Sequence, residues 1–224
     1  MIDPHSPEFN GLGAIVFDFD GVLVESNELK AEAFYRLYLP FGKDIANHVA
    51  NDHRRNQGVS RYIKIRKWHA DLLGVALSDQ EVETMARQFG DLVKSAVIDA
   101  PMVDGSMDFL KVWAGRVPMY VASATPESEL REIATAKGIA GFFTDIGGFP
   151  RKKTELLALA AHACGAANVI MVGDAIQDLE AARSAGARFI GRICDGNDAL
   201  FTGMPCFRSF RELPGCISAT LTSD

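Results

Sequence analysis

The chain has 224 residues, of which 48% are hydrophobic and 23% are charged, and its formal net charge is −6. This length allows one large domain or a core domain with a smaller insertion, and the composition is that of a folded globular protein rather than a disordered or fibrous one. The negative charge and the lack of a long Lys/Arg run argue against a nucleic-acid partner.

The pattern along the chain begins with a short apolar run at 14–17, which predicts a buried strand. From about residue 28 to residue 100 only helical patterns follow. Ser78, three residues before Glu81, is a capping-box signature, and Gly74 is suited to end the helix before it. Four helices are therefore expected as a block inserted after the first strand, at 28–39, 43–56, 60–73 and 78–97.

After residue 100, strand-like and helical patterns alternate. Alternation of this kind predicts an α/β fold, in which helices cover both faces of a parallel sheet. Further strands are expected at 118–122, 169–172 and 188–190, and Phe142 and Phe143 suggest another. Helices are expected at 106–113, 127–137, 154–164 and 176–185.

Two carboxylates follow the first predicted strand. Asp18 and Asp20, in the run Phe-Asp-Phe-Asp-Gly, are expected at the carboxyl edge of the sheet, where parallel sheets bind ligands. One of them can attack a substrate or bind a metal ion while the other transfers a proton. A pair of turn-forming aspartates before Gly21 is the alternative interpretation.

Two more carboxylates, Asp174 and Asp178, follow the predicted strand at 169–172. Asp174 is also suited to cap the next helix. However, four acidic groups at one sheet edge repel each other unless a cation lies between them. Oxygen ligands without nearby Cys or His favour Mg²⁺ over zinc.

A hydroxyl and a group of cations complete the candidate site. Ser123 ends the predicted strand at 118–122, and its hydroxyl and the backbone amide of Ala124 are suited to a phosphate oxygen if Thr125 caps the next helix. Cations at 151–153 precede a helix, where the helix dipole disfavours them, so an anion nearby would explain them. A solvated serine and a solvated basic cluster are the alternatives.

These elements, in this order, resemble the haloacid dehalogenase superfamily. The resemblance covers nearly the whole chain, and the helical block stands where the phosphoglycolate phosphatase and β-phosphoglucomutase branch inserts an α-helical cap. It implies a Rossmann-like three-layer core of residues 1–24 and 101–224, with a cap of residues 25–100. The matching positions are Asp18-Phe19-Asp20-Gly21 for the first motif, Ser123 for the second, Lys152 or Lys153 for the third, Gly173-Asp174 with Asp178 for the fourth, and Gly58-Val59-Ser60-Arg61 for a cap loop.

The resemblance implies a phosphatase mechanism. Asp18 resembles the nucleophile that forms an aspartyl-phosphate, and Asp20 resembles the acid/base. Ser123 and a lysine would bind the phosphoryl group, with Lys153 preferred over Lys152 because Pro-x-x-Lys followed by Thr-Glu is most similar to related sequences.

The same resemblance implies a metal ion and a substrate contact. Mg²⁺ would be held by Asp18, the main-chain carbonyl of Asp20 and Asp174, with Asp178 beside them. Arg61 is the cap cation expected to contact substrate. The expected substrate is a small phosphorylated metabolite, such as a sugar, polyol or acid phosphate, and the chain is expected to be a monomer or homodimer.

Three alternatives stay open. A phosphomutase of this branch differs from the chain, because its linker histidine corresponds to Lys30 and its Glu-Asp pair to Gly173-Asp174. A phosphonate hydrolase uses an imine-forming cap lysine, for which Lys30 or Lys64 would be the candidate, although solvated lysines are the commoner case. A noncatalytic binding protein with this fold is the third.

The remaining expectations concern location and cysteines. No apolar run approaches the roughly 18 residues that cross a bilayer, and the first ten residues lack the regions of a signal peptide. We therefore expect a cytoplasmic protein without a membrane partner. The cysteines have neither CxxC nor His-paired spacing, so they are interpreted as free buried thiols at Cys164, Cys194, Cys206 and Cys216.

Overall fold

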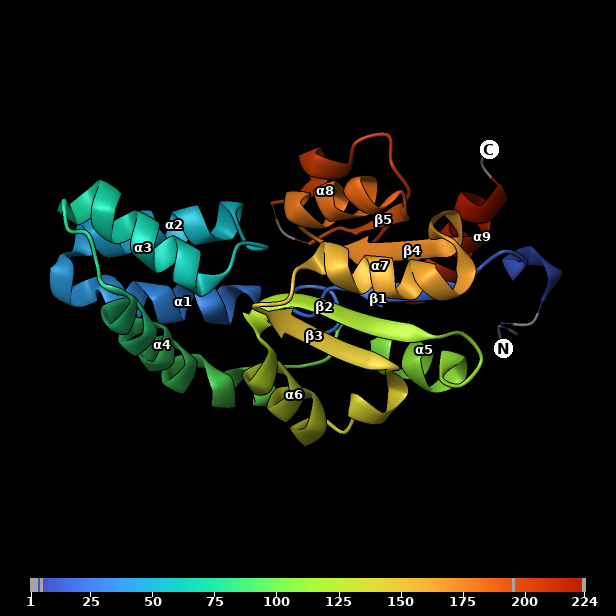
Figure 1. The fold of residues 1–224 in the computed structure, drawn as a ribbon, viewed down its shortest axis with the longest axis horizontal. Helices are drawn as coiled ribbons and strands as arrows, with labels where there is room; N and C mark the ends of the chain where they lie inside the picture. The colour runs from blue at the N-terminus through green and yellow to red at the C-terminus, as the bar shows by residue number, and fades with distance from the viewer. Residues whose placement is uncertain (1–3, 5, 195, 223–224) are drawn as a thin grey trace. The chain divides into compact units, whose positions relative to one another are not determined.

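The computed structural model of the chain describes residue 4, residues 6–194 and residues 196–222. The first residues, for which the sequence predicts no signal peptide, lie partly outside the described residues. The chain divides into two compact units, a core unit formed by the residues up to Glu25 and from Pro101 onward, and a helical unit of Ser26–Ala100 (Figure 1). Each unit is described by itself below.

The core unit is built on a parallel sheet of six strands, counted over the described residues, in the order β3-β2-β1-β4-β5-β6. β1 lies in the middle, and the strand order reverses there, which is the arrangement that creates a ligand site at the carboxyl end of the central strand. The predicted Rossmann-like α/β fold is therefore confirmed. The strands are β1 (Ala14–Phe17), β2 (Met119–Pro126), β3 (Asp145–Phe149), β4 (Val169–Gly173), β5 (Arg188–Arg192) and β6 (Cys206–Phe207).

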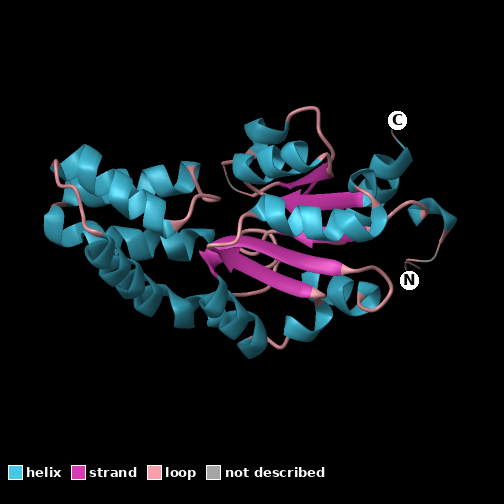
Figure 2. Ribbon diagram, in the orientation of Figure 1, coloured by secondary structure: helices cyan, strands magenta, loops and turns pink. Residues whose placement is uncertain are grey.

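Helices cover both faces of this sheet (Figures 1 and 2). On one face, Val16 and Met171 pack with Leu157 of α7 and Ala182 of α8 in one buried cluster. On the other face, the Phe17 ring lies 6.0 Å from the rings of Phe109 and Phe210. The longer helices of the core unit are α5 (Ser106–Trp113), α6 (Glu127–Ala136), α7 (Lys153–Cys164), α8 (Ile176–Ala185) and α9 (Leu213–Thr222), with short 3-10 turns at Pro7–Phe9, Ala140–Phe142, Ala166–Asn168 and Asp198–Phe201.

One strand prediction was wrong. Phe142 lies in a 3-10 turn and Phe143 follows it, while the strand β3 begins at Asp145. The sequence of β3 gives a weak strand signal because it contains two glycines, and glycine has a low strand propensity. Both are required by packing, because a Cβ at Gly147 would lie 2.3 Å from Leu156 and a Cβ at Gly148 would lie 2.3 Å from the Thr125 carbonyl oxygen.

The helical unit contains the predicted helices. The capping box is present, since the Ser78 amide donates to Glu81 Oε2 at 2.8 Å and the Glu81 amide donates to Ser78 Oγ at 3.3 Å. Gly74 ends the preceding helix in the left-handed region, with φ of 65°. The helices are α1 (Asn27–Tyr38), α2 (Lys43–Arg55), α3 (Arg61–Leu73) and α4 (Asp79–Asp99), with a 3-10 turn at Leu39–Phe41.

Aromatic side chains form the interior of the helical unit. The rings of Phe34 and Phe89 are stacked with centroids 3.9 Å apart, and Trp68 meets Phe34 edge-on at 5.0 Å. Such pairs add directional packing to the burial of large apolar surface. They join α1, α3 and α4 around one aromatic centre.

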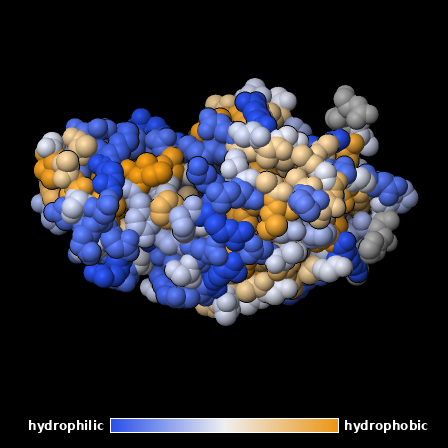
Figure 3. All heavy atoms as spheres, viewed as in Figure 1, coloured by the Kyte–Doolittle hydropathy of each residue, from blue (hydrophilic) through white to orange (hydrophobic). Residues whose placement is uncertain are grey.

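The surface is mixed in hydropathy. Hydrophilic and hydrophobic residues are interspersed over the face drawn in Figure 3. Among the described helices, none combines the length and the apolar character needed to span a bilayer.

The four cysteines are free, but they are not buried as predicted, because Cys206 is exposed and the other three are half-buried.

Candidate active site

The site is built at the end of the central strand. Phe17 is in register with Val121 of β2 and Val172 of β4, and the Asp18 amide donates to the Val172 carbonyl at 2.9 Å. The ladder therefore continues to Asp18 and fixes its backbone at the carboxyl edge. Gly21, with φ of 73°, then turns the chain away from the sheet.

Three carboxylates converge on this edge. Asp18, Asp174 and Asp178 each offer one oxygen, and these oxygens lie within 4.8 Å of one another. Their exposed fractions are 5%, 2% and 0%. Asp178 comes this close only because position 173 lacks a side chain, since a Cβ on Gly173 would lie 2.2 Å from the Asp178 Cβ. Asp174 is not the cap of α8 that the sequence also allowed, because Ala175 occupies that position and its amide donates to Asp178 Oδ2 at 3.1 Å.

One ammonium group joins two of these carboxylates. Lys153 Nζ lies 2.9 Å from Asp18 Oδ2 and 2.5 Å from Asp178 Oδ1. Burial acts to lower the pKa of Lys153, but the charges of Asp178 and Asp18 outweigh it, so the pKa is raised above its ordinary value. Lys153 is therefore held as a cation inside the acidic cluster.

The pKa of Asp18 is raised well above its ordinary value. Burial is the largest cause, the Lys153 charge opposes it, and the charges of Asp178, Asp174 and Asp20 raise it further. A second cation between Asp18, Asp174 and Asp178 would reduce the repulsion between these carboxylates. Carboxylate oxygens are the ligands that Mg²⁺ prefers, so this donor set fits a hard divalent cation.

Asp20 lies beside the hydroxyl groups of β2. Thr125 Oγ1 donates to Asp20 Oδ2 at 3.0 Å, and Ser123 Oγ donates to the same oxygen at 3.4 Å. The prediction that Thr125 caps a helix was wrong, because β2 continues through Pro126 and α6 begins at Glu127. Ala124 lies in the same stretch of β2, between the two hydroxyl residues.

The three cations before α7 have different surroundings. Arg151 pairs with Asp145 at 2.7 Å and Glu127 at 3.4 Å, and the side chain of Lys152, which precedes the helix, is exposed. Lys153 is the first residue of α7, and it alone of the three contacts the acidic cluster. Of the two lysines, Lys153 is therefore the one that lies in the candidate site.

Two neighbours of the cluster were missed by sequence analysis. Asn197 Nδ2 donates to the Asp174 carbonyl at 2.9 Å and to the Arg192 carbonyl at 3.0 Å, and its Oδ1 accepts from the Cys194 amide at 2.9 Å. Cys194 Sγ lies 3.7 Å from Asp174 Oδ2, and burial followed by the Asp174 charge raises the pKa of Cys194 to about 12, so the thiol donates. An Asn in a Gly- and Asp-rich loop gives no sequence signal beyond that of a turn.

The other candidate residues belong to the helical unit. Arg61 begins α3, where its guanidinium carbon lies 4.6 Å from the Phe89 ring centroid and Nη1 donates to the Ala86 carbonyl at 3.3 Å. Arg61 is buried, and so are Lys30 and Lys64. The expectation that these lysines are solvated was wrong, because both side chains are buried, and Lys64 Nζ lies 6.0 Å from the Phe34 ring centroid.

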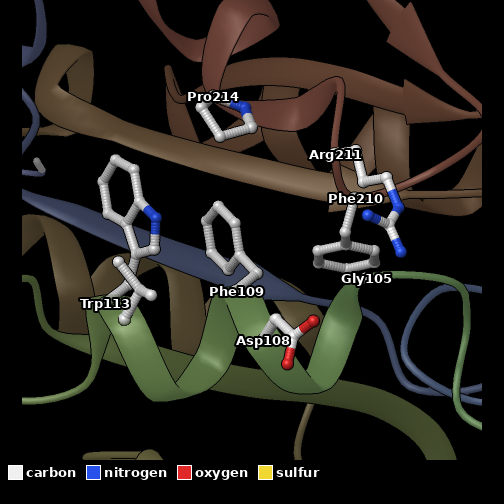
Figure 4. A pocket seen from close by; sticks show the side chains of 8 residues that line it. Gly105, Asp108, Phe109, Trp113, Phe210, Arg211 and Pro214 are labelled. Carbon is white, nitrogen blue, oxygen red and sulfur yellow. The ribbon is translucent and has the colours of Figure 1, made fainter. Parts of the chain in front are cut away.

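A separate pocket of the core unit contains no part of the acidic cluster. It has a volume of about 370 Å³ and lies between α5 and the segment that leads into α9 (Figure 4). Phe109, Trp113, Phe210 and Pro214 supply an apolar lining, with one acidic group at Asp108. No cluster of reactive side chains marks it as a catalytic site.

Comparisons with known proteins agree with this geometry. The family model of the haloacid dehalogenase-like hydrolases matches residues 12–186. The phosphoglycolate phosphatase of Photobacterium profundum is 26% identical over 200 residues, covering 82% of this chain and 84% of that protein. A phosphorylated carbohydrates phosphatase of Thermotoga maritima is 27% identical over 202 residues, covering 83% of this chain and 87% of that protein.

Solved structures share the fold. β-Phosphoglucomutase from Clostridium difficile superposes with a TM-score of 0.74 at 18% identity, covering 95% of this chain and all of that one (100%). A mutant of CbbY from Rhodobacter sphaeroides, in complex with xylulose-(1,5)bisphosphate, superposes with a TM-score of 0.72 at 20% identity. The match covers 90% of this chain and 96% of that one. With the family match over residues 12–186 and this site geometry, the chain belongs to the haloacid dehalogenase-like hydrolases and is an enzyme of the phosphatase type.

Proposed function

We propose that the chain hydrolyses a small phosphorylated metabolite, such as a sugar, polyol or acid phosphate, through an aspartyl-phosphate on Asp18. The observation that carries the proposal is Lys153, which bridges Asp18 and Asp178 beside the buried Asp174 at the end of the central strand. A carboxylate nucleophile held beside a fixed cation is what transfer of a negatively charged phosphoryl group requires.

The first half-reaction uses Asp18 and Asp20. A carboxylate oxygen of Asp18 attacks phosphorus, the bond from phosphorus to the ester oxygen breaks, and Asp20 gives its proton to the leaving alcohol. The hydroxyls of Thr125 and Ser123 orient the Asp20 carboxyl group. Lys153, the Ser123 hydroxyl and the Ala124 amide bind the phosphoryl oxygens.

The second half-reaction is hydrolysis of the acyl phosphate. Asp20, now ionised, takes a proton from water, the water oxygen bonds to phosphorus, and the bond to Asp18 breaks to release inorganic phosphate. Asp18, Asp174, Asp178 and the main-chain carbonyl of Asp20 are the groups that would hold Mg²⁺. When bound, Mg²⁺ supplies positive charge to the transferring phosphoryl group.

Hydrolysis fits the chain better than phosphomutase chemistry. Gly173 stands where a phosphomutase of this branch has glutamate. The space beside Gly173 is filled by Asp178, because a Cβ at position 173 would lie 2.2 Å from the Asp178 Cβ.

The direct test of the proposed function is a screen of phosphorylated metabolites that follows phosphate release by the purified protein with Mg²⁺. The substrates named for the two relatives, phosphoglycolate and phosphorylated carbohydrates, are the first to include. Release from none of them above the rate of an Asp18→Asn control would overturn the proposal.

Mg²⁺ is expected to raise the melting temperature as well as to support turnover. A ligand at about 100 times its Kd adds about 2.7 kcal/mol to the free energy of unfolding. The positive charge of the ion would oppose both causes that raise the pKa of Asp18, first its burial and then the charges of Asp178, Asp174 and Asp20. Ca²⁺ is expected to bind but to inhibit, because its larger, looser shell misaligns the attack. Asp174→Asn should lose the thermal shift, and Asp44→Asn, the same change at an exposed position, should keep it. An equal shift in both variants would contradict the metal assignment.

Thr125→Val is expected to lower kcat by about 10- to 100-fold with little change in KM. A hydrogen bond to a charged group contributes about 1.5–3 kcal/mol, and the Thr125 hydroxyl orients Asp20 at 3.0 Å without being placed on the substrate. Thr125→Ser keeps the hydroxyl and should retain kcat within about twofold. If Ser and Val lower kcat equally, Thr125 has a packing role only.

The helical unit is proposed to act as the cap that selects substrates. Its content of buried basic side chains supports this assignment, and Arg61 stays the predicted substrate contact among them. The cytoplasmic location and the choice between monomer and homodimer also stay predictions from the sequence.

A further inference from the structure

Arg192, the last residue of β5, is a buried arginine of the core unit. It is 6% exposed, and its guanidinium group has two partners on the loop that follows β1. Nη1 donates to the Gly21 carbonyl at 2.8 Å and to Glu25 Oε2 at 3.1 Å, while Nη2 lies 2.5 Å from Glu25 Oε1. Burying a charged group is costly unless its partners are well placed. The choice of these two partners therefore needs a physical reason.

The loop that Arg192 contacts carries the proposed acid/base. Gly21 directly follows Asp20, and the Gly21 amide donates to the Val24 carbonyl at 2.8 Å. Both peptide groups of Gly21 are therefore held, one from within the loop and the other by Arg192. Glycine restricts its own backbone less than any other residue. Contacts from other parts of the chain are what fix a turn at such a position.

The main chain of Arg192 is tied to the second acidic loop. Asn197 Nδ2 donates to the Arg192 carbonyl at 3.0 Å and to the Asp174 carbonyl at 2.9 Å. Asp174 is one of the three carboxylates of the acidic cluster. The end of β5 thus connects the loop of Asp20, through the Arg192 side chain, with the loop of Asp174, through the Arg192 main chain.

A second arginine at the other end of β5 makes the same kind of contact away from the acidic cluster. Arg188 begins β5, and its Nε donates to the Ala167 carbonyl at 2.9 Å. Its Nη1 donates to the Thr220 carbonyl of α9. Arg188 and Arg192 therefore both bind main-chain carbonyls from one strand, and they differ in which end of the strand they support.

We propose that Arg192 is a positioning residue, which holds the turn at Gly21 and thereby fixes the Asp20 carboxyl group relative to the acidic cluster. The proposal rests on the proposed function in one respect, because it concerns the acid/base of that reaction. The Arg192 guanidinium binds the loop after β1, whereas Lys153 and Ser123 are the side chains proposed to bind the phosphoryl group. Its loss should therefore slow the chemical step more than it weakens substrate binding.

The kinetic test uses the full-length protein with Mg²⁺ and a substrate found in the metabolite screen, below the melting transition of each variant. Arg192→Met should lower kcat by about 10- to 100-fold and change KM less than about threefold, since a misplacement of about 1 Å can cost about 100-fold in rate. Arg188→Met, the matched control on the same strand, should change kcat less than about twofold. Equal losses of kcat in the two variants would overturn the positioning role.

Amide hydrogen exchange, followed by NMR, tests the turn without turnover. The exchange rate of the Gly21 amide is divided by that of the Asp18 amide, which donates to the Val172 carbonyl at 2.9 Å, so that changes in global stability do not raise the ratio. Arg192→Met should raise this ratio about 10-fold or more, because the loop loses a hydrogen bond to a charged group. Arg188→Met should not raise it. An unchanged ratio in Arg192→Met overturns the proposal.

Arg192→Lys keeps the measurements decisive if Arg192→Met does not fold. A single ammonium group does not reproduce the planar fork that serves Gly21 and both oxygens of Glu25. Smaller changes in the same direction are expected in both measurements, and wild-type values in both would overturn the proposal.

The two measurements also separate this proposal from the proposed function. A raised exchange ratio with an unchanged kcat would overturn the positioning role, because the turn would then open without affecting Asp20. A wild type that hydrolyses none of the metabolites, while Gly21 still responds to Arg192→Met, would contradict the proposed function and not the contact of Arg192 with the loop.

Discussion

Asp18→Asn is expected to lower kcat by about 10⁴-fold or more while the protein stays folded. The amide has nearly the shape of the carboxylate, but it does not attack phosphorus and is a poor ligand for Mg²⁺. The backbone contact that places residue 18, from its amide to the Val172 carbonyl, does not involve the side chain. The loss should therefore appear in the chemical step and not in folding.

Stability gives an independent measure for this variant. The raised pKa of Asp18 shows that its charge is unfavourable in the buried cluster, although the pair with Lys153 offsets part of the cost. Removing one partner of a buried ion pair usually destabilises a protein, but in this variant Lys153 keeps Asp178 as a partner at 2.5 Å and the unfavourable Asp18 charge is removed, so the two effects oppose each other. We expect circular dichroism spectra like those of the wild type.

The matched control is Asp108→Asn, which makes the same chemical change at an exposed position of α5 in the core unit. Phosphate release from any substrate found in the screen is the measurement, and the control should retain wild-type turnover. A rate for Asp18→Asn within about 100-fold of the wild type would argue against a covalent intermediate on this residue.

The sequence predicts the helices and central strands of this fold well because their signals are local. Helical periodicity, the Ser78–Glu81 capping box and Gly74 define α3 and α4 to within one or two residues of the structure. β3 was missed for the opposite reason. Its glycines are required by Leu156 of α7 and by the backbone of β2, which are tertiary contacts that no local pattern contains.

The site shows the same division between local and tertiary information. The positions of Asp18 and Asp174 follow from strand ends, which the sequence reveals. Thr125 was interpreted as a helix cap because Pro126 follows it, whereas β2 continues to that proline and the Thr125 hydroxyl donates to Asp20. Asn197 joins the site through a loop whose course depends on β5 and on the Asp174 backbone.

The sequence pattern did not predict that the basic side chains of the helical unit are buried. On a helix, Arg61 and Lys64 are three residues apart and share a face, and a mixed pattern of this kind usually predicts a solvated stripe. Here that face meets Phe34 and Phe89. Side chains that carry both a long apolar stem and a charge fit either environment, so their pattern does not choose between them.

Lys153→Met is expected to lower kcat/KM by about 10³-fold, whereas Lys152→Met should change it less than about twofold. The two lysines are adjacent, so the comparison removes effects of overall charge near the site. Lys153 Nζ contacts Asp18 and Asp178, while Lys152 precedes α7 with its side chain exposed. Methionine keeps the apolar stem of lysine and removes only the ammonium group. A larger loss in Lys152→Met than in Lys153→Met would reverse the assignment.

The same variant should also be less stable in a way that depends on pH and metal. Removing one partner of a buried ion pair typically costs about 3–5 kcal/mol, because Asp18 and Asp178 then repel each other without a cation between them. Lys153 lowers the pKa of Asp18, so its loss raises that pKa further above the value in the unfolded chain. A group with a raised folded pKa stabilises the fold most when it is protonated, and that contribution is lost as the pH rises through the folded pKa.

Thermal melts of Lys153→Met should therefore show a smaller loss of melting temperature, relative to the wild type, at acidic pH than at alkaline pH. Mg²⁺ should reduce this deficit at alkaline pH. A deficit that is independent of both pH and Mg²⁺ would mean that Lys153 stabilises the core by packing and not by its charge.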